Sequence, residues 1–217
     1  MNPSIPASEK RIVIPGEVIS EERKRTGAHV FVDNGRIVSE TLGVVYADAA
    51  LAQVVALRGK YEPILDDIVI GIVAQETFNG YLIDTGSMYN SFISKEAVRD
   101  KLERGSVVSA KVVSVSEIGE VELEEPRGFF GGELIRIAPV KVPRVIGKQG
   151  SMLNVLKNGT NCNIVVGRNG RLWIKGGNTS LLRRALDFIE AHSHESNLTQ
   201  RIEEFLAHPP AQQNANG

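Results

Sequence analysis

Two glycines separated by two residues, Gly147 and Gly150, form the most chemically informative motif in this 217-residue sequence. Glycine lets one backbone approach another closely, because it has no Cβ and adopts positive φ angles without strain. Lys148 and Gln149 would occupy the tip of the loop between them, where the lysine adds a positive charge. A helix capped by Ser151 would add free amide groups and the positive end of its dipole. The motif therefore predicts a site for a nucleic-acid backbone.

The elements predicted around this motif follow a recognisable order. They are a strand, a short basic segment, the loop, a helix, two strands joined by an Asn-Gly turn, and an amphipathic helix, at residues 134–137, 141–144, 147–150, 152–157, 162–166, 172–175 and 179–191. This order resembles a type I KH domain. The resemblance implies a loop that clamps the backbone of about four nucleotides, with base selection by the adjacent groove.

The formal net charge of −1 hides an uneven distribution along the chain. Residues 1–62 are neutral, residues 63–126 carry a net charge of −7, and residues 127–217 carry +6. Between residues 127 and 176, nine basic side chains accompany Glu133 as the only acidic one. A local basic excess is typical of nucleic-acid binding. We therefore expect basic residues near the loop to extend the phosphate-binding surface, namely Lys141, Arg144, Arg168 and Arg171.

The middle segment contains five short strand-like pieces, the number typical of an OB-type barrel: residues 68–74, 80–84, 91–93, 107–115 and 120–124. Residues 67–73, 80–84 and 105–112 resemble an S1 RNA-binding domain. That resemblance implies stacking of bases on exposed aromatic rings, for which Phe78 and Tyr81 are the candidates. Both residues could instead belong to the barrel core, and the acidic charge of this segment opposes RNA binding.

The first segment has short β elements. Asn34-Gly35 predicts a tight hairpin turn, residues 11–14 an edge strand, and residues 47–57 either a helix or a strand. Such a small segment cannot bury a large core, so we expect it to pack on a neighbour or partner. The predicted fold is an α+β multidomain protein. It comprises a small N-terminal β domain (1–62), an S1 (OB-fold) β-barrel (63–126), a type I KH α/β domain with a C-terminal helix (127–207) and a disordered tail (208–217).

Other residues favour structural roles. Cys162 is the only cysteine, which excludes an intrachain disulfide, and it is expected to be buried. No apolar run is long enough for a membrane span or a signal peptide, so we expect a soluble cytoplasmic protein. Trp173, Phe129 and Phe130 are expected in the KH core or an interdomain seam. No carboxylate pair or His/Cys cluster has catalytic or metal-ligand spacing, so we expect no catalytic site, metal or cofactor.

The order of the three segments, together with Pro15-Gly16-Glu17 and residues 137–152, resembles the S1/KH cap subunit of the archaeal RNA exosome. The resemblance implies a non-catalytic subunit, three copies of which sit on a hexameric ring of phosphorolytic RNase-fold subunits. It also implies capture of single-stranded RNA, with A-rich RNA as one class, and cap positions shared with the zinc-ribbon cap protein. The chain itself lacks the cysteines of that zinc-ribbon protein.

Three alternatives remain open. An S1/KH factor of transcription elongation or translation is one, although elongation factors of this type carry two KH domains. A fragment of polynucleotide phosphorylase would have its KH domain before S1, the reverse of this order. A stand-alone nuclease would need a carboxylate cluster for metal ions or an acid/base pair.

Overall fold

The computed structural model describes residues 11–48, 50–57, 59–193 and 197–208. The chain divides into two compact units, Met1–Gly59 and Lys60–Gly217, and each is described by itself. The tail predicted to be disordered lies outside the described residues, apart from His208.

The first unit contains two small sheets. One has the strand order β1-β6-β7-β3 and the other β2-β5-β4. The hairpin turn at Asn34-Gly35 is confirmed, since both residues have positive φ and Asp33 pairs with Arg36. The segment that could form either a helix or a strand forms β7, paired antiparallel with β6. The strand bounds are β1 (Ile12–Val13), β2 (Val18–Ser20), β3 (Arg25–Thr26), β4 (Val30–Asp33), β5 (Arg36–Ser39), β6 (Gly43–Ala47) and β7 (Leu51–Ala56).

The second unit begins with a closed barrel of five strands in the order β10-β12-β11-β8-β9. Val69, Val73 and Val108 belong to its core, and alternate residues of the same strands face outward. The strands are β8 (Ile68–Glu76), β9 (Gly80–Asp84), β10 (Asn90–Ser94), β11 (Val107–Val115) and β12 (Glu120–Phe129), with a short 3-10 helix η1 (Lys95–Ala97) after β10.

Strand β12 continues five residues beyond its predicted end at Glu124. Its partner register on β11 shifts between Ser109 and Lys111, and Pro126 lies in the bulge that this shift creates. Proline is tolerated at a bulge because it has no ladder hydrogen bond to lose there.

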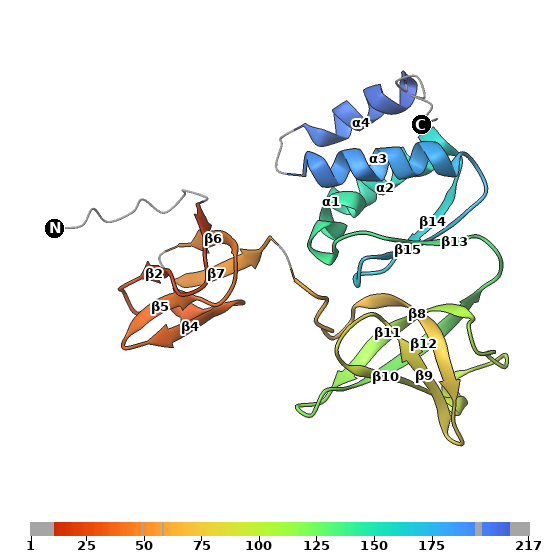
Figure 1. Cartoon of the computed structure of the whole chain (residues 1–217), viewed down its shortest axis with the longest axis horizontal. Coiled ribbons are helices and arrows are strands. Elements are labelled where there is room, and N and C mark those ends of the chain that lie inside the picture. The colour runs from red at the N-terminus through yellow and green to blue at the C-terminus, as the bar shows by residue number, and fades with distance from the viewer. Residues whose placement is uncertain (1–10, 49, 58, 194–196, 209–217) are drawn as a thin grey trace, which may run out of the picture. The chain divides into compact units, whose positions relative to one another are not determined.

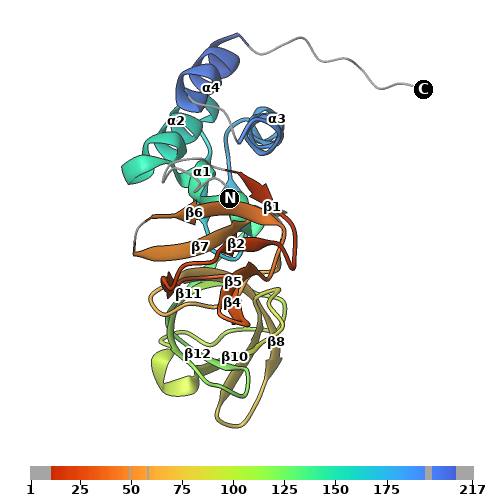
Figure 2. The ribbon, with the colours of Figure 1, turned by 90° about the vertical axis from the view of Figure 1, so that its left-hand side faces the viewer.

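The KH domain follows, with a sheet of order β13-β15-β14 and all helices on one face of that sheet (Figure 1). A fourth helix packs on α2 and α3 and adds Leu198 and Ile202 to the core (Figure 2). The predicted order of elements and the fold class are confirmed. The elements are β13 (Glu133–Arg136), η2 (Pro139–Lys141), α1 (Val142–Ile146), η3 (Lys148–Gly150), α2 (Ser151–Thr160), β14 (Asn163–Val166), β15 (Arg171–Lys175), α3 (Thr179–Ala191) and α4 (Leu198–Ala207).

Barrel and KH domain are connected through the end of β12. The rings of Phe129 and Trp173 stack with centroids 4.6 Å apart, and the Trp173 indole donates to the Gly131 carbonyl across 2.8 Å. This confirms the predicted seam for these two aromatic residues. The prediction is wrong for Phe130, which is 83% exposed because it follows the last paired residue of β12.

Candidate nucleic-acid interface

The Gly-x-x-Gly loop lies between α1 and α2 in a conformation that depends on its glycines. Gly147 has φ of 73° and ends α1, and a Cβ there would lie only 2.7 Å from the Met152 amide nitrogen. Gly150 has φ of 80° and forms the N-cap of α2, with open space around it. Gln149, at φ 53°, also adopts the left-handed region. The sharp reversal brings the loop backbone to the surface at the start of a ten-residue helix.

The expected role of Ser151 as a cap is wrong, because Ser151 is the first residue of α2 and Gly150 takes the cap position. Gly150 has no side chain that could accept from the first amides of the helix. The Ser151 amide donates to the Lys148 carbonyl, and the positive end of the helix dipole lies beside the loop.

Four of the predicted binding residues surround this loop at the surface. Lys148 and Gln149 are exposed at the tip, and Arg144 is exposed on α1. Lys141 is half-buried, with its ammonium group bonded to the hydroxyl of Ser193. Together they present cations and polar groups around the loop, as a nucleic-acid backbone requires.

Arg168 is also exposed, but it lies on the turn between β14 and β15. Its guanidinium lies 3.9 Å from a carboxylate oxygen of Asp67 in the barrel. Half of the side chain remains in solvent, so its charge remains available to a phosphate.

The predictions for Arg171 and Tyr81 need correction. The Arg171 side chain is 3% exposed and donates to Asp84, and Tyr81 is 3% exposed within the barrel core. A buried guanidinium with a carboxylate partner cannot reach a phosphate, and a buried ring has no free face for a base. Both residues stabilise the fold instead.

Phe78 is 94% exposed on the turn between β8 and β9, so its ring is free to stack. Thr77 holds this turn, since its hydroxyl donates to the Gly80 carbonyl across 2.9 Å. The turn lies at the end of the barrel far from the KH domain (Figures 1 and 2). The structure therefore does not bring Phe78 together with the Gly147–Gly150 loop.

One polar residue at the junction of the barrel and the KH domain has a structural role that the sequence does not indicate. The sequence predicts Asn169 only as part of a turn, yet it is 7% exposed and bonds to the barrel backbone. Only Gly170 of this Asn-Gly pair has a positive φ. The turn therefore does not need asparagine for its conformation, and nothing local in the sequence indicates that the amide is used elsewhere.

Within the described part of the chain, no group of three or more His, Cys, Asp or Glu side chains could hold a metal ion. None of the described helices is long and apolar enough to cross a membrane.

A KH sheet with a glycine-flanked loop, joined to a closed five-stranded barrel, defines a nucleic-acid-binding protein of the S1/KH class. The KH domain family matches residues 132–180. A crystal structure described as a candidate exosome complex RNA-binding protein superimposes with a TM-score of 0.61 and 30% identity, covering 69% of this chain and 96% of that one.

Curated relatives are similar over almost the whole chain. "Exosome complex component Rrp4" of Methanobrevibacter smithii is 36% identical, covering 91% of this chain and 71% of that protein. Its counterpart in Methanothermus fervidus is 35% identical, covering 91% of this chain and 96% of that protein. The chain belongs to the family of Rrp4 exosome complex components.

Proposed function

We propose that this protein is a non-catalytic RNA-binding cap subunit of an exosome. It captures single-stranded RNA and directs it into a phosphorolytic 3′–5′ exoribonuclease ring for degradation or processing. The observation that carries this proposal is the exposed Lys148-Gln149 tip between two glycines, in a chain that belongs to the Rrp4 family. Three copies on a hexameric ring in the cytoplasm, alone or mixed with the zinc-ribbon cap protein, complete the proposal.

The loop binds RNA through its backbone. Gly147 and Gly150 allow a close approach, the positive end of the α2 dipole attracts a phosphate, and the ammonium group of Lys148 neutralises charge. Arg144 and Lys141 extend the positive surface on α1 and at its start. This mode supports binding of many RNA sequences, since phosphate contacts carry no base information.

The barrel takes a different part. Its net charge of −7 disfavours extensive phosphate contact, while Phe78 offers one exposed ring for stacking. We infer that RNA bound at the KH loop makes a secondary, largely non-ionic contact with the barrel. Most of the remaining barrel surface contacts protein or solvent.

The test replaces the loop tip while leaving both glycines in place. In the Lys148→Asp/Gln149→Asp variant, we expect affinity for a 20-nucleotide oligoadenylate to fall about tenfold or more at low salt. The slope of log K against log salt should fall by about 0.7 for each phosphate that the variant no longer neutralises. Arg104→Asp, an exposed charge reversal on the barrel, is the control and should have a smaller effect. Equal effects of the two variants, or unchanged affinity in the loop variant, would refute RNA capture by this loop.

Catalysis is tested separately. The purified protein incubated with RNA and either Mg²⁺ or phosphate should leave the RNA intact, whereas shortened products would contradict the non-catalytic assignment.

A further inference from the structure

Strand β8 of the barrel has an open edge near its start. Strand β9 pairs with β8 only from Ile72 onward, where Ile72 lies opposite Asp84. Beyond Asp84 the chain turns away at Gly86, whose φ is 75° and whose amide donates to the Asp84 carboxylate across 2.8 Å. Residues 68–70 of β8 therefore lack a strand partner on this side. Such an edge exposes backbone groups that must find other partners when buried.

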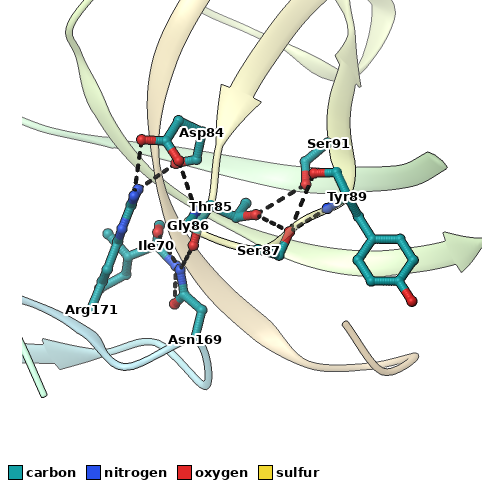
Figure 3. A network of polar contacts seen from close by, with 9 residues as sticks. All are labelled: Ile70, Asp84, Thr85, Gly86, Ser87, Tyr89, Ser91, Asn169 and Arg171. Atoms are coloured by element: carbon teal, nitrogen blue, oxygen red, sulfur yellow. Dashed lines mark hydrogen bonds and ion pairs between the residues drawn. The ribbon is translucent and has the colours of Figure 1, made fainter. Parts of the chain in front are cut away.

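The KH turn between β14 and β15 supplies those partners (Figure 3). The Arg168 amide donates to the Ile68 carbonyl across 2.8 Å. The Asn169 side-chain amide then acts as a short strand segment: it accepts from the Ile70 amide across 3.1 Å and donates to the Ile70 carbonyl across 2.7 Å. It also donates to the Thr85 carbonyl across 2.7 Å. Asn169 thereby satisfies three backbone groups of the barrel.

The contact is buried and closely fitted. Ile70 alternates with core residues Val69 and Val73, so it faces outward, yet it is fully buried. Gly167 lies so close that a Cβ there would come within 2.8 Å of the Ile70 nitrogen. In the barrel alone, an outward-facing Ile70 would be exposed to water. Its burial therefore comes from the KH turn.

The barrel side of the contact has its own hydrogen bonds. The hydroxyl of Thr85 lies 2.9 Å from that of Ser87 and 3.2 Å from that of Ser91, which hold the loop that presents the Thr85 carbonyl. Thr85 and Ser91 are both buried. The Thr85 carbonyl that accepts from Asn169 thus belongs to a loop with hydroxyl contacts of its own.

The second connection between the domains runs through Gly131 and Gly132, two consecutive glycines with positive φ. Consecutive glycines permit reorientation when nothing else restrains them. The stack of Phe129 on Trp173 attaches the middle of β15, and the β14–β15 hairpin attaches a second place through Asn169 and the Arg171–Asp84 pair. Two attachments at separate places restrict the orientation of the KH domain relative to the barrel, whereas a single attachment would let the domain rotate.

We propose that Asn169 is a positioning residue for RNA binding: its side-chain amide closes the open edge of β8 and holds the KH loop at a fixed place relative to the barrel. This inference rests on the proposed function. An RNA long enough to reach both the Gly147–Gly150 loop and Phe78 gains affinity from the fixed arrangement, because the second contact then forms at high effective concentration. A short RNA that reaches only the KH loop gains nothing from it.

The experiment compares full-length protein with Asn169→Ala and with Asn163→Ala, which removes an exposed asparagine from the same hairpin. Spin labels are placed at exposed positions on the barrel and on α2, through Glu122→Cys and Asn154→Cys in a Cys162→Ala background. We expect a narrow distance distribution in the parent and in Asn163→Ala, and a broad one in Asn169→Ala. Asp84→Ala, which removes the exposed partner of Arg171, provides a second variant if Asn169→Ala does not fold, and should also broaden the distribution.

The RNA measurement uses oligoadenylates of 4 and 20 nucleotides. Asn169→Ala should bind the 4-nucleotide RNA as the parent does. The ratio of its affinity for the 20-nucleotide RNA to its affinity for the 4-nucleotide RNA should be about tenfold smaller than in the parent. A narrow distribution or an unchanged ratio in Asn169→Ala overturns the positioning role. Failure of the parent protein to bind either RNA overturns the proposed function instead, so the two failures are distinguishable.

Discussion

Arg171 of the KH sheet donates from Nη2 to a carboxylate oxygen of Asp84 across 3.0 Å, joining residues 87 positions apart in the sequence. Its other terminal nitrogen bonds to the main-chain oxygen of the same aspartate. The Arg171 side chain is 3% exposed, while half of the Asp84 side chain remains in solvent. A buried arginine left without its carboxylate is costly, so this pair ties the orientation of the KH sheet to the ionisation of Asp84.

The stability of the second unit should therefore depend on acid pH. Burial by itself raises the pKa of Asp84, but hydrogen bonds from Arg171 and the Gly86 amide, with the charges of Arg171 and Arg136, together hold that pKa below its ordinary value of 3.8. A lowered pKa stabilises the fold above pH 3.8, and this contribution is lost as the pH falls through the lower folded-state pKa. Urea unfolding between pH 6 and pH 2.5 should show a steeper loss in the parent than in Asp84→Asn. Parallel pH profiles would contradict the linkage.

Substitution of Tyr81 should affect stability, whereas substitution of Phe78 should affect RNA affinity. Tyr81→Ala removes a buried ring from the core and should lower the free energy of unfolding by about 3–5 kcal/mol, as large-to-small aromatic substitutions do. Phe78→Ala should leave stability unchanged, because Phe78 is 94% exposed, and should weaken binding of a 20-nucleotide RNA by about 1 kcal/mol or more. Chemical denaturation and fluorescence anisotropy measure the two effects. Unchanged RNA affinity in Phe78→Ala would exclude stacking on the barrel at this position.

The two glycines of the loop should differ in their tolerance of a methyl group. A Cβ at Gly147 would lie 2.7 Å from the Met152 nitrogen, within backbone, whereas one at Gly150 meets nothing within 4 Å. Gly150, with φ of 80° and ψ of 9°, lies in the left-handed region, where alanine costs about 1 kcal/mol, whereas Gly147, with φ of 73° and ψ of 177°, lies in a region that essentially only glycine adopts. Gly147→Ala should therefore destabilise by about 2 kcal/mol or more, and Gly150→Ala by about 1 kcal/mol. Thermal unfolding gives the comparison, and equal losses would show that the loop relaxes around Gly147.

Ring assembly should depend on the first unit. The unit Met1–Gly59 is compact by itself and has its own small core around Val13, Ile37 and Val54. We expect a chain beginning at Lys60 to lose co-purification with the exosome ring while retaining RNA affinity. Native mass spectrometry of the pull-down gives the stoichiometry. Retention of the ring by the truncated chain would place the assembly surface in the second unit.

The KH domain was predictable because its signals are local. Each signal involves residues that are close together in the sequence: the spacing of Gly147 and Gly150, the apolar face of α3 and the order of the elements. The same locality explains the errors. Ser151 has the residue type of a cap, but the cap position depends on where α2 begins. Tyr81 and Phe78 are three residues apart and chemically similar, but Tyr81 lies in β9 facing the core and Phe78 lies on the turn before that strand.

The sequence by itself determined the class of each domain, the basic character of the KH region and the loop whose backbone conformation requires glycine. The tertiary structure alone decided which cations remain at the surface: Arg168 does, while Arg171, three residues later, is buried against Asp84. It also decided the role of Asn169, whose partners at Ile70 and Thr85 lie 99 and 84 positions away. The reason is physical. Periodicity and turn propensity are properties of neighbouring residues, whereas burial and the pairing of an open strand edge depend on chain segments that meet only in the fold.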